Sequence, residues 1–236
     1  MLNSFFDILY LQTKLYKMKN NFAYLLCLIL GLGILNIATA QEGDSKADDG
    51  WIPLFNGKNL DGWKVGENAH TFSVENGAIK VAGPKAHLFY VGDVENHNFD
   101  NFEFKASVMT KPGSNSGIYI HTRYQEASWP VHGYEVQVNN SQGDWKRTGS
   151  LYDIVNVIET YVGDDEWYTE YIKVEGKRII VKINDIVVVD YTEPENPKRD
   201  PGERQHRVLK GGTFALQGHD PKSTVYYKDI MVKPLP

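Results

Sequence analysis

The stretch that decides the fold is Phe99-Asp-Asn-Phe-Glu-Phe-Lys-Ala-Ser-Val-Met109, in which apolar and polar residues alternate. Successive side chains on a β-strand point to opposite faces, so every second residue shares an environment. One side of this segment is apolar and consists of Phe102, Phe104, Ala106 and Val108. The other side carries Glu103, Lys105, Ser107 and Met109 and is mostly polar. The pattern predicts a long strand with one face in a core.

Shorter segments with strand character lie on both sides of it. Residues 71–74 and 78–81 flank Asn76-Gly77, a dipeptide typical of a two-residue hairpin turn. Further strands are expected at 170–174, 178–183, 186–191 and 224–233. No helical period extends over three turns after residue 50. Many short strands separated by frequent turns predict an all-β protein, a β-sandwich of two sheets.

Three of the segments carry polar residues at every second position. Residues 117–123 read Gly-Ile-Tyr-Ile-His-Thr-Arg, residues 133–139 read Gly-Tyr-Glu-Val-Gln-Val-Asn, and residues 213–219 read Thr-Phe-Ala-Leu-Gln-Gly-His. Alternation predicts that the polar members of each segment share one face. If the three strands are neighbours, one sheet face collects Tyr119, His121, Arg123, Glu135, Gln137, Asn139, Gln217 and His219.

Four of these side chains are the catalytic candidates. Glu135 lies in mid-strand between apolar neighbours and could act as a general base. His121 could shuttle protons, and the guanidinium of Arg123 could hold a carbonyl or a pair of hydroxyls. His219 precedes Asp220-Pro221, a sequence that favours a strand end and turn over a cooperating pair. His121, Glu135 and His219 could also bind a divalent metal if they converge, although their spacing does not demand it.

The loop between the first two of these strands contains Trp129-Pro130. An indole there could stack on the apolar face of a sugar ring, or it could close the core. The segment 193–210 is a long loop rich in proline and charge, and a loop of this length in a compact domain is usually functional or mobile.

The start of the 236-residue chain resembles an export signal. Lys19 precedes an apolar stretch over 22–37, and Ala38-Thr39-Ala40 is a small-residue cleavage site. We therefore expect a signal peptide over residues 1–40, with Met18 as an alternative start, a flexible leader over 41–50 and one domain over 51–236. The apolar stretch is too short and interrupted for a stable membrane span, so the expected location is the periplasm or the extracellular space.

Charge and cysteine content narrow the function. Without residues 1–40 the chain retains 22 basic and 29 acidic residues and has no basic stripe, which argues against nucleic acid as a partner. The single cysteine, Cys27, lies inside the expected signal, so the domain has no thiol nucleophile. The chain lacks a Gly-x-Ser-x-Gly elbow and a phosphate loop. Its oligomeric state stays open.

Several longer motifs follow one another along the chain. They are the opening stretch 50–63 (Gly-Trp-Ile-Pro-Leu-Phe-Asn-Gly-Lys-Asn-Leu-Asp-Gly-Trp), Asn115-Ser-Gly-Ile-Tyr119, Gly133-Tyr-Glu-Val-Gln137, Thr148-Gly-Ser-Leu-Tyr152, residues 212–220 and residues 225–235. Together they resemble the motifs of one known family, the 3-keto-disaccharide hydrolase domain family. The resemblance spans residues 50–235 in the same order. It departs at Asn184-Asp185, where the family usually has Asn-Gly, which affects only a turn.

The resemblance implies a concanavalin A-like jelly-roll sandwich and action on a carbohydrate oxidised to a ketone at carbon 3. Such a ketone acidifies the C2 proton, so that one base can remove it and start the elimination of the C1 substituent. Addition of water to the resulting enone then completes the cleavage of the glycoside. On this hypothesis Glu135 or His121 is the base, and Arg123 or His219 polarises the ketone. Gln137, Gln217, Tyr152, Trp129 and Tyr119 would hold the sugar.

Two other functions remain open at this point. The same fold hosts carbohydrate-binding modules that lack catalysis, and a fold alone does not determine a function. A conventional endo-glucanase would need a second carboxylate facing Glu135, for which Asp144, Asp153 and Asp220 are candidates. The face predicted above supplies only one carboxylate, which argues mildly against ordinary glycoside hydrolysis.

Overall fold

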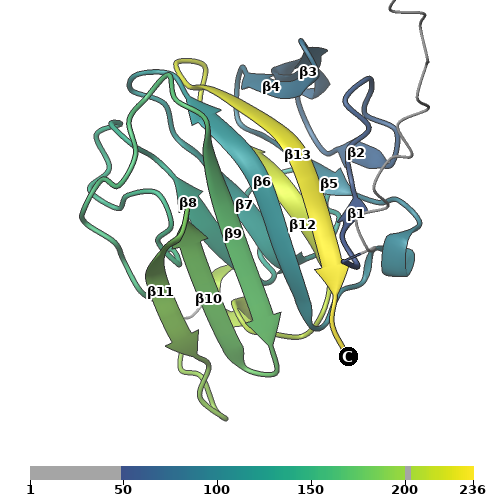
Figure 1. Cartoon of the computed structure of the whole chain (residues 1–236), viewed down its shortest axis with the longest axis vertical. Helices are drawn as coiled ribbons and strands as arrows, with labels where there is room; N and C mark the ends of the chain where they lie inside the picture. The colour runs from purple at the N-terminus through teal and green to yellow at the C-terminus, as the bar shows by residue number, and fades with distance from the viewer. Residues whose placement is uncertain (1–48, 200–202) are drawn as a thin grey trace, which may run out of the picture. The chain divides into compact units, whose positions relative to one another are not determined.

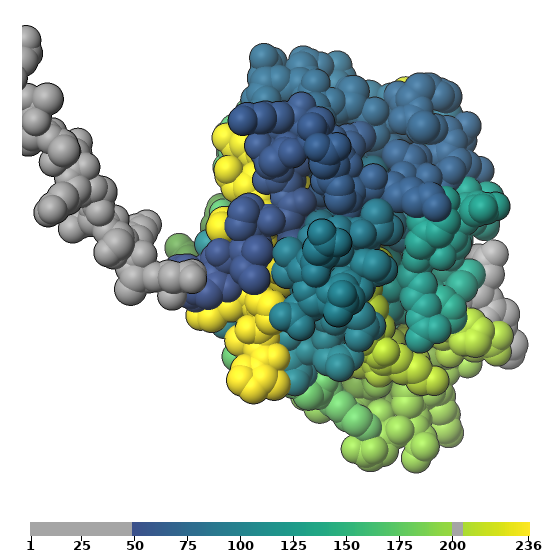
Figure 2. Space-filling model, turned by 90° about the vertical axis from the view of Figure 1, so that its right-hand side faces the viewer, coloured from purple at the N-terminus to yellow at the C-terminus, as the bar shows by residue number. Residues whose placement is uncertain are grey.

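Two antiparallel sheets face each other in the computed structural model, which describes residues 49–199 and 203–236. The expected signal peptide and nearly all of the expected leader lie outside these residues. In Figure 1 the larger sheet stands in front of the smaller one. A view from the side shows that the blue residues following Asp49 cover much of one face of the domain (Figure 2).

The larger sheet contains the long alternating strand. Its order is β11 (Ile186–Thr192), β10 (Arg178–Ile183), β9 (Tyr168–Glu175), β6 (Phe102–Thr110), β13 (Thr224–Pro234), β4 (Ala78–Ala82) and β3 (Phe72–Glu75), with β1 (Ile52–Pro53) also paired to β13. Strand β6 lies near the middle, and its alternating exposure matches the predicted pattern. Its apolar residues point to the other sheet, and Phe102 and Phe104 are fully buried.

The smaller sheet contains the three polar segments. Its order is β2 (Trp63–Val65), β5 (Ala86–Tyr90), β12 (Thr213–Gly218), β7 (Ser116–Thr122) and β8 (Tyr134–Val138). Strands β12, β7 and β8 are direct neighbours, which is the condition under which their polar residues were expected to share one sheet face. Burying each large apolar side chain between the sheets stabilises the fold by about 1.5–3 kcal/mol, so the alternating pattern sets which face of each strand turns inward.

Turn chemistry agrees with the predicted hairpin. Asn76 and Gly77 have φ values of 51° and 78°, as a turn of type I′ requires, and they join β3 to β4. Within the described ranges the only helical segments are short 3-10 turns, at Ala69–Thr71, Val94–His97 and Glu203–His206. Among those same residues no helix is long and apolar enough to cross a membrane.

One strand departs from strict alternation at His121. Thr122 pairs with Thr213 and Tyr119 with Ala215, so β7 carries one more residue than β12 over this interval. His121 has a φ of 53°, and this extra residue forms a β-bulge. The prediction that His121 shares a face with Tyr119 was therefore wrong. Its ring lies 5.7 Å from that of Phe102 in the core, and its Nε2–H donates to the Asp100 carbonyl at 2.9 Å.

Candidate active site

The outer face of the smaller sheet, opposite the core, carries a layer of buried polar side chains. In one row, Glu135 pairs with Tyr119, and Ala215 of the next strand also pairs with Tyr119. In the adjacent row His87 pairs with Gln217, and Gly117 pairs with Gln137. All the polar members of the two rows are at most 6% exposed. Burial at this level on an outer face means that loops cover the sheet here.

Glu135 is the centre of this layer. Its carboxylate accepts hydrogen bonds from the Tyr119 hydroxyl at 3.0 Å and from Gln217 Nε2 at 2.6 Å. Gln217 Nε2 also lies 3.2 Å from the Tyr119 oxygen, which closes a small network. Gly117 leaves the space that the carboxylate occupies, because a Cβ there would lie 2.8 Å from Glu135 Oε1. The sequence thus holds Glu135 in one orientation, with glycine beneath it and donors at its side.

Burial determines the charge state of this carboxyl. It raises the pKa of Glu135 above its ordinary value of 4.5, because water no longer solvates the carboxylate. Arg207, the two hydrogen bonds and His219 act in the opposite direction, since each favours the charged form. A carboxylate with a raised pKa that still has positive charge nearby is suited to accept a proton.

Two loops bring cations and an aromatic ring to the layer. Arg207 belongs to the proline-rich segment, and its Nη1 donates to the Tyr152 carbonyl at 3.1 Å. The Tyr152 amide in turn donates to the Glu135 carbonyl at 2.9 Å. Lys146 lies 4.0 Å above the Tyr152 ring and forms an ion pair of 2.9 Å with Asp153. These contacts place Tyr152 beside Glu135 and set two cations around its ring.

A second group of rings lies on the other flank of Gln217. The His87 ring is 5.4 Å from the ring of Tyr119 and 5.5 Å from that of Trp129, and Trp129 is 5.6 Å from His219. Burial first, then Lys85 and His219, lowers the pKa of His87 to about 3, so this imidazole is neutral near pH 7. His87 Nε2 has no hydrogen-bond partner within the described residues. The group provides an aromatic wall containing a neutral imidazole.

His219 and Asp220 cooperate although they are adjacent in sequence. His219 Nδ1 lies 2.7 Å from Asp220 Oδ2, which also accepts from Ser223 Oγ at 2.9 Å. Because both residues follow the end of β12, the divergence expected on an extended strand does not apply. The prediction that the pair merely marks a turn missed this contact. Because Nδ1 is engaged with Asp220, Nε2 is the nitrogen of His219 that can bind a ligand or exchange a proton with it.

Most of the site residues expected from the sequence are brought together, but two are not. Glu135, Tyr119 and Gln217 form the network, Gln137 shares their sheet face, and Trp129, His219 and Tyr152 surround them. His121 turns away at the bulge. Arg123 follows the end of β7 and lines a pocket whose lining includes none of the three network residues.

The hypothetical metal set of His121, Glu135 and His219 does not converge, because His121 lies on the core side of the sheet. Over residues 49–199 and 203–236, no group of three or more His, Cys, Asp or Glu side chains is arranged to hold a metal ion.

Sequence reasoning missed three residues at the site: His87, Lys146 and Arg207. His87 had a readable signal, because Ala86-His-Leu-Phe-Tyr90 places it on the face opposite Leu88. Arg207 carried only a general signal, its position in a long charged loop. Lys146 had none, since its role follows from the path of the loop that contains Tyr152.

Comparison with known proteins agrees with this architecture. The family model for the 3-keto-alpha-glucoside-1,2-lyase-like domain matches residues 50–233. A 3-keto-disaccharide hydrolase of Bacteroides thetaiotaomicron is 26% identical over 170 residues, which are 61% of this chain and 59% of the relative. The chain thus matches somewhat under two thirds of that relative's length.

Solved structures share the fold. A candidate glycosyl hydrolase of Parabacteroides distasonis superposes with a TM-score of 0.67 at 21% identity, covering 79% of this chain and 94% of that one. The carbohydrate-binding module CBM66 of Bacillus subtilis gives a TM-score of 0.50 at 13% identity, covering 73% and 95%. At these identities the likeness concerns the fold alone. The predicted jelly-roll sandwich of two antiparallel sheets is confirmed.

Proposed function

The chain belongs to the 3-keto-alpha-glucoside-1,2-lyase-like domain family, and on that premise we propose that it is an enzyme that cleaves 3-keto-glycosides, including 3-keto-disaccharides. The observation that carries the proposal is the buried carboxylate of Glu135 on the outer face of the smaller sheet. Burial raises its pKa, and Arg207 lies close enough to favour its charged form. A ketone substrate needs one base and one stabiliser of negative charge, which are the groups that converge here.

The reaction begins with the C2–H bond, which the neighbouring C3 ketone acidifies. Glu135 accepts this proton, and the bonding electrons move onto the ketone oxygen as an enolate. The enolate electrons then return to form a double bond between C1 and C2 while the bond from C1 to the glycosidic oxygen breaks. Addition of water at C1, with return of a proton to C2, gives the free 3-keto sugar. Neither an oxocarbenium ion nor a nucleophilic carboxylate is required.

Arg207 is the residue we assign to the enolate. Its guanidinium is held by the Tyr152 carbonyl, and its charge already lowers the pKa of the Glu135 carboxyl. A fixed cation in a site with little water stabilises negative charge that develops on the ketone oxygen. Arg207 thereby takes the role for which the sequence suggested Arg123 or His219.

His219 is placed to protonate the leaving oxygen. Its Nδ1 is engaged with Asp220, so Nε2 is free to exchange a proton with substrate. Trp129, 5.6 Å from the His219 ring, offers an apolar face on which a sugar can stack. Gln217, Gln137, Tyr119 and Tyr152 contribute the hydrogen-bonding groups that we assign to the sugar hydroxyls.

A conventional endo-glucanase mechanism fits this site less well. It requires a second carboxylate facing the scissile bond. The three aspartates that could supply it have other partners: Asp144 accepts from the Tyr152 hydroxyl at 3.3 Å, Asp153 pairs with Lys146, and Asp220 pairs with His219. Glu135 is the one carboxylate in the buried layer of the smaller sheet.

We also propose that residues 1–40 direct the protein out of the cytoplasm. The proposal is supported by the sequence alone, in which a basic start, an apolar stretch and Ala38-Thr39-Ala40 follow in the order of a signal peptide. Fractionation of cells that express the full chain would test it, because an exported protein is recovered shortened and outside the cytoplasm.

The activity is tested by incubating the purified protein with a 3-keto-glucoside and, separately, with its unoxidised parent, each with and without chelator. We expect cleavage of the keto form alone. Binding of the unoxidised sugar with turnover of neither compound would replace the proposal with a carbohydrate-binding module. Loss of cleavage with chelator would add a metal that the proposed steps do not use.

A further inference from the structure

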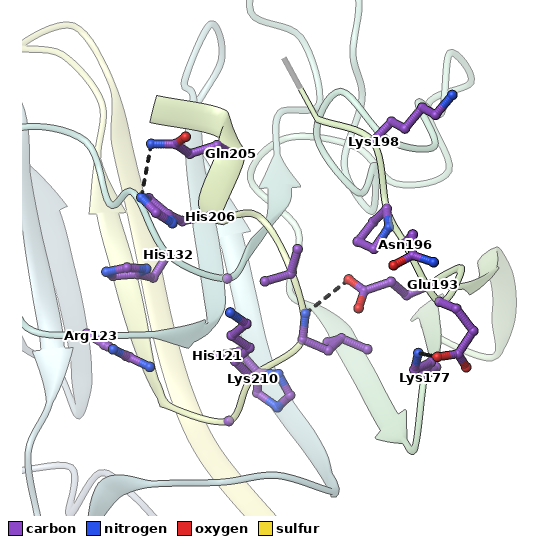
Figure 3. Close-up of a pocket in the computed structure, with 16 residues that line it drawn as sticks. His121, Arg123, His132, Lys177, Glu193, Asn196, Lys198, Gln205, His206 and Lys210 are labelled. Atoms are coloured by element: carbon purple, nitrogen blue, oxygen red, sulfur yellow. Dashed lines mark hydrogen bonds and ion pairs between the residues drawn. The ribbon is translucent and has the colours of Figure 1, made fainter. Parts of the chain in front are cut away.

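A second cavity, of about 670 Å³, lies beside the active site and shares none of the three residues of its network. One wall is formed by residues 205–211, which we call the strap. His206 and Lys210 of the strap line the cavity, whereas Arg207 between them reaches the Tyr152 carbonyl at the active site. Figure 3 shows the labelled residues that surround this cavity.

The strap is anchored at several points along its backbone. The Gly133 amide donates to the His206 carbonyl at 3.2 Å, and the Leu209 amide donates to Glu193 Oε2 at 3.0 Å. Arg199 Nε donates to the Arg207 carbonyl at 2.8 Å. These bonds tie the strap to the residue that precedes β8 and to the segment that follows β11, so the cavity wall is part of the fold.

Four of the basic side chains that line the cavity lie at the wall formed by the strap, two from the strap and two facing it: His206 and Lys210, and Arg123 and His132. The rings of His132 and His206 are only 5.0 Å apart. Burial lowers the pKa of His132, and the neighbouring charges of Arg123, His206 and Lys210 lower it further. His132 is therefore close enough to each of the other three groups for their positive charge to act on its ring.

The acidic residues of the cavity do not neutralise this wall. Glu193 accepts from the Tyr134 hydroxyl and the Leu209 amide and lies 3.8 Å from Arg199. Glu195 pairs with Lys177 at 2.7 Å. Within the described ranges, no carboxylate forms an ion pair with Arg123, His132, His206 or Lys210. A cluster of like charges without a counter-charge raises the energy of the free protein, and a bound anion relieves it.

We propose that this cavity binds an oxyanion, either the carboxylate of a sugar acid or a phosphate group, between Arg123, His132, His206 and Lys210. The planar guanidinium can hold two oxygens of such a group, the ammonium supplies a further charged donor, and the imidazole rings can each donate an N–H. The volume is within the range of sites for small organic molecules. Asn196 and Gln205 at the cavity offer partners for hydroxyl groups.

The probes are sodium glucuronate, inorganic phosphate and glucose, measured by titration calorimetry on the full chain. We expect heat of binding with glucuronate or with phosphate and none with glucose. Glucuronate alone would identify a sugar acid, and phosphate alone a phosphate group. Arg123→Gln and Lys210→Gln should each weaken the binding about tenfold, since each removes a charge-assisted hydrogen bond.

Lys58→Gln is the matched control, because Lys58 is an exposed lysine that does not line the cavity. It should bind the anion as the unmodified protein does. Binding of neither anion, or binding that survives both cavity substitutions, would overturn the proposal. Because the readout is binding and not turnover, the result is independent of whether the protein cleaves 3-keto-glycosides.

Discussion

Two buried glutamates, one in each sheet, show how the proposed catalytic carboxylate differs from one that is only buried. Glu135 of β8 is 6% exposed and Glu170 of β9 is fully buried. Burial raises the pKa of both above 4.5. By the pKa criterion alone, Glu170 would be at least as strong a candidate for the catalytic base.

Their surroundings differ in every other respect. Glu135 accepts hydrogen bonds from Tyr119 and Gln217, and Arg207 and His219 favour its charged form. Neither oxygen of Glu170 has a hydrogen-bond partner in the part of the chain that the structure describes, and burial is the single cause of its raised pKa. A raised pKa therefore reports desolvation, and donors and cations that converge on the group are what indicate chemistry.

The strongest test of the difference between Glu135 and Glu170 is to replace each of them with glutamine in turn. Glu135→Gln should lower kcat on a 3-keto-glucoside by about 10²–10⁴-fold, the usual contribution of a general base. Glu170→Gln should leave kcat nearly unchanged, which makes it a control for altering a buried carboxyl. Steady-state kinetics of the two variants decide the matter, and near-normal turnover by Glu135→Gln would remove Glu135 from its role.

The two arginines offer a similar pair. Arg207→Gln should lower kcat/KM by about 10²–10³-fold, because it removes the cation assigned to the enolate oxygen. Arg123→Gln changes an exposed residue of the second cavity, and activity should stay within about twofold, as is usual for surface substitutions. Equal losses in both variants would show that the site extends to the second cavity.

A substitution at Gly117 tests whether activity depends on the exact position of the Glu135 carboxylate. Gly117→Ala places a methyl group 2.8 Å from Glu135 Oε1 and should displace the carboxylate. We expect kcat to fall about tenfold to a hundredfold, since small misplacements of reacting groups are costly. Gly143→Ala is the control, as a Cβ there meets nothing within 4 Å. Full activity of Gly117→Ala would mean that the observed orientation of Glu135 is not needed.

The smallest expected effect is the contribution of Glu170 to the pH dependence of the free energy of unfolding. A carboxyl whose pKa is raised in the folded state holds its proton more tightly there than in the unfolded chain. The folded protein therefore loses stability as pH rises from the ordinary pKa of 4.5 through the folded value. Glu170→Gln removes this loss, so the variant should gain on the unmodified protein by about 1.4 kcal/mol for each pH unit between these two pKa values.

Urea unfolding at about pH 4 and about pH 8 measures this difference, because the lower pH lies below both pKa values and the carboxyl is largely protonated in both states there. The other titrating groups are common to both proteins and cancel in the comparison. A stability difference that does not change with pH would mean that Glu170 titrates alike in the folded and unfolded states.

Alternation in the sequence was sufficient to predict an all-β sandwich and the residues at the centre of the candidate site, whereas the jelly-roll fold was implied by the family resemblance. The apolar set of β6 identified the core, and the polar sets of β7, β8 and β12 brought Tyr119, Glu135 and Gln217 together. These predictions succeeded because the two-residue period of a strand is a direct consequence of backbone geometry.

The remainder depended on features that alternation does not encode. The bulge at His121 adds one residue to β7 and breaks its two-residue period, and the residue with positive φ is a histidine, not a glycine. Arg207 reaches the site because three residues outside the strap anchor the strap by hydrogen bonds: Gly133, Glu193 and Arg199. His219 meets Asp220 because both lie beyond the strand. Tertiary contacts decide each of these positions.

The most direct test of the central claim, that this site removes the C2 proton of a 3-keto sugar, is an isotope comparison. The purified protein is given a 3-keto-glucoside and the same compound with deuterium at C2, and the two cleavage rates are measured. Our account predicts slower cleavage of the deuterated compound and loss of its deuterium to water. Equal rates with deuterium retained at C2 in the product would contradict it.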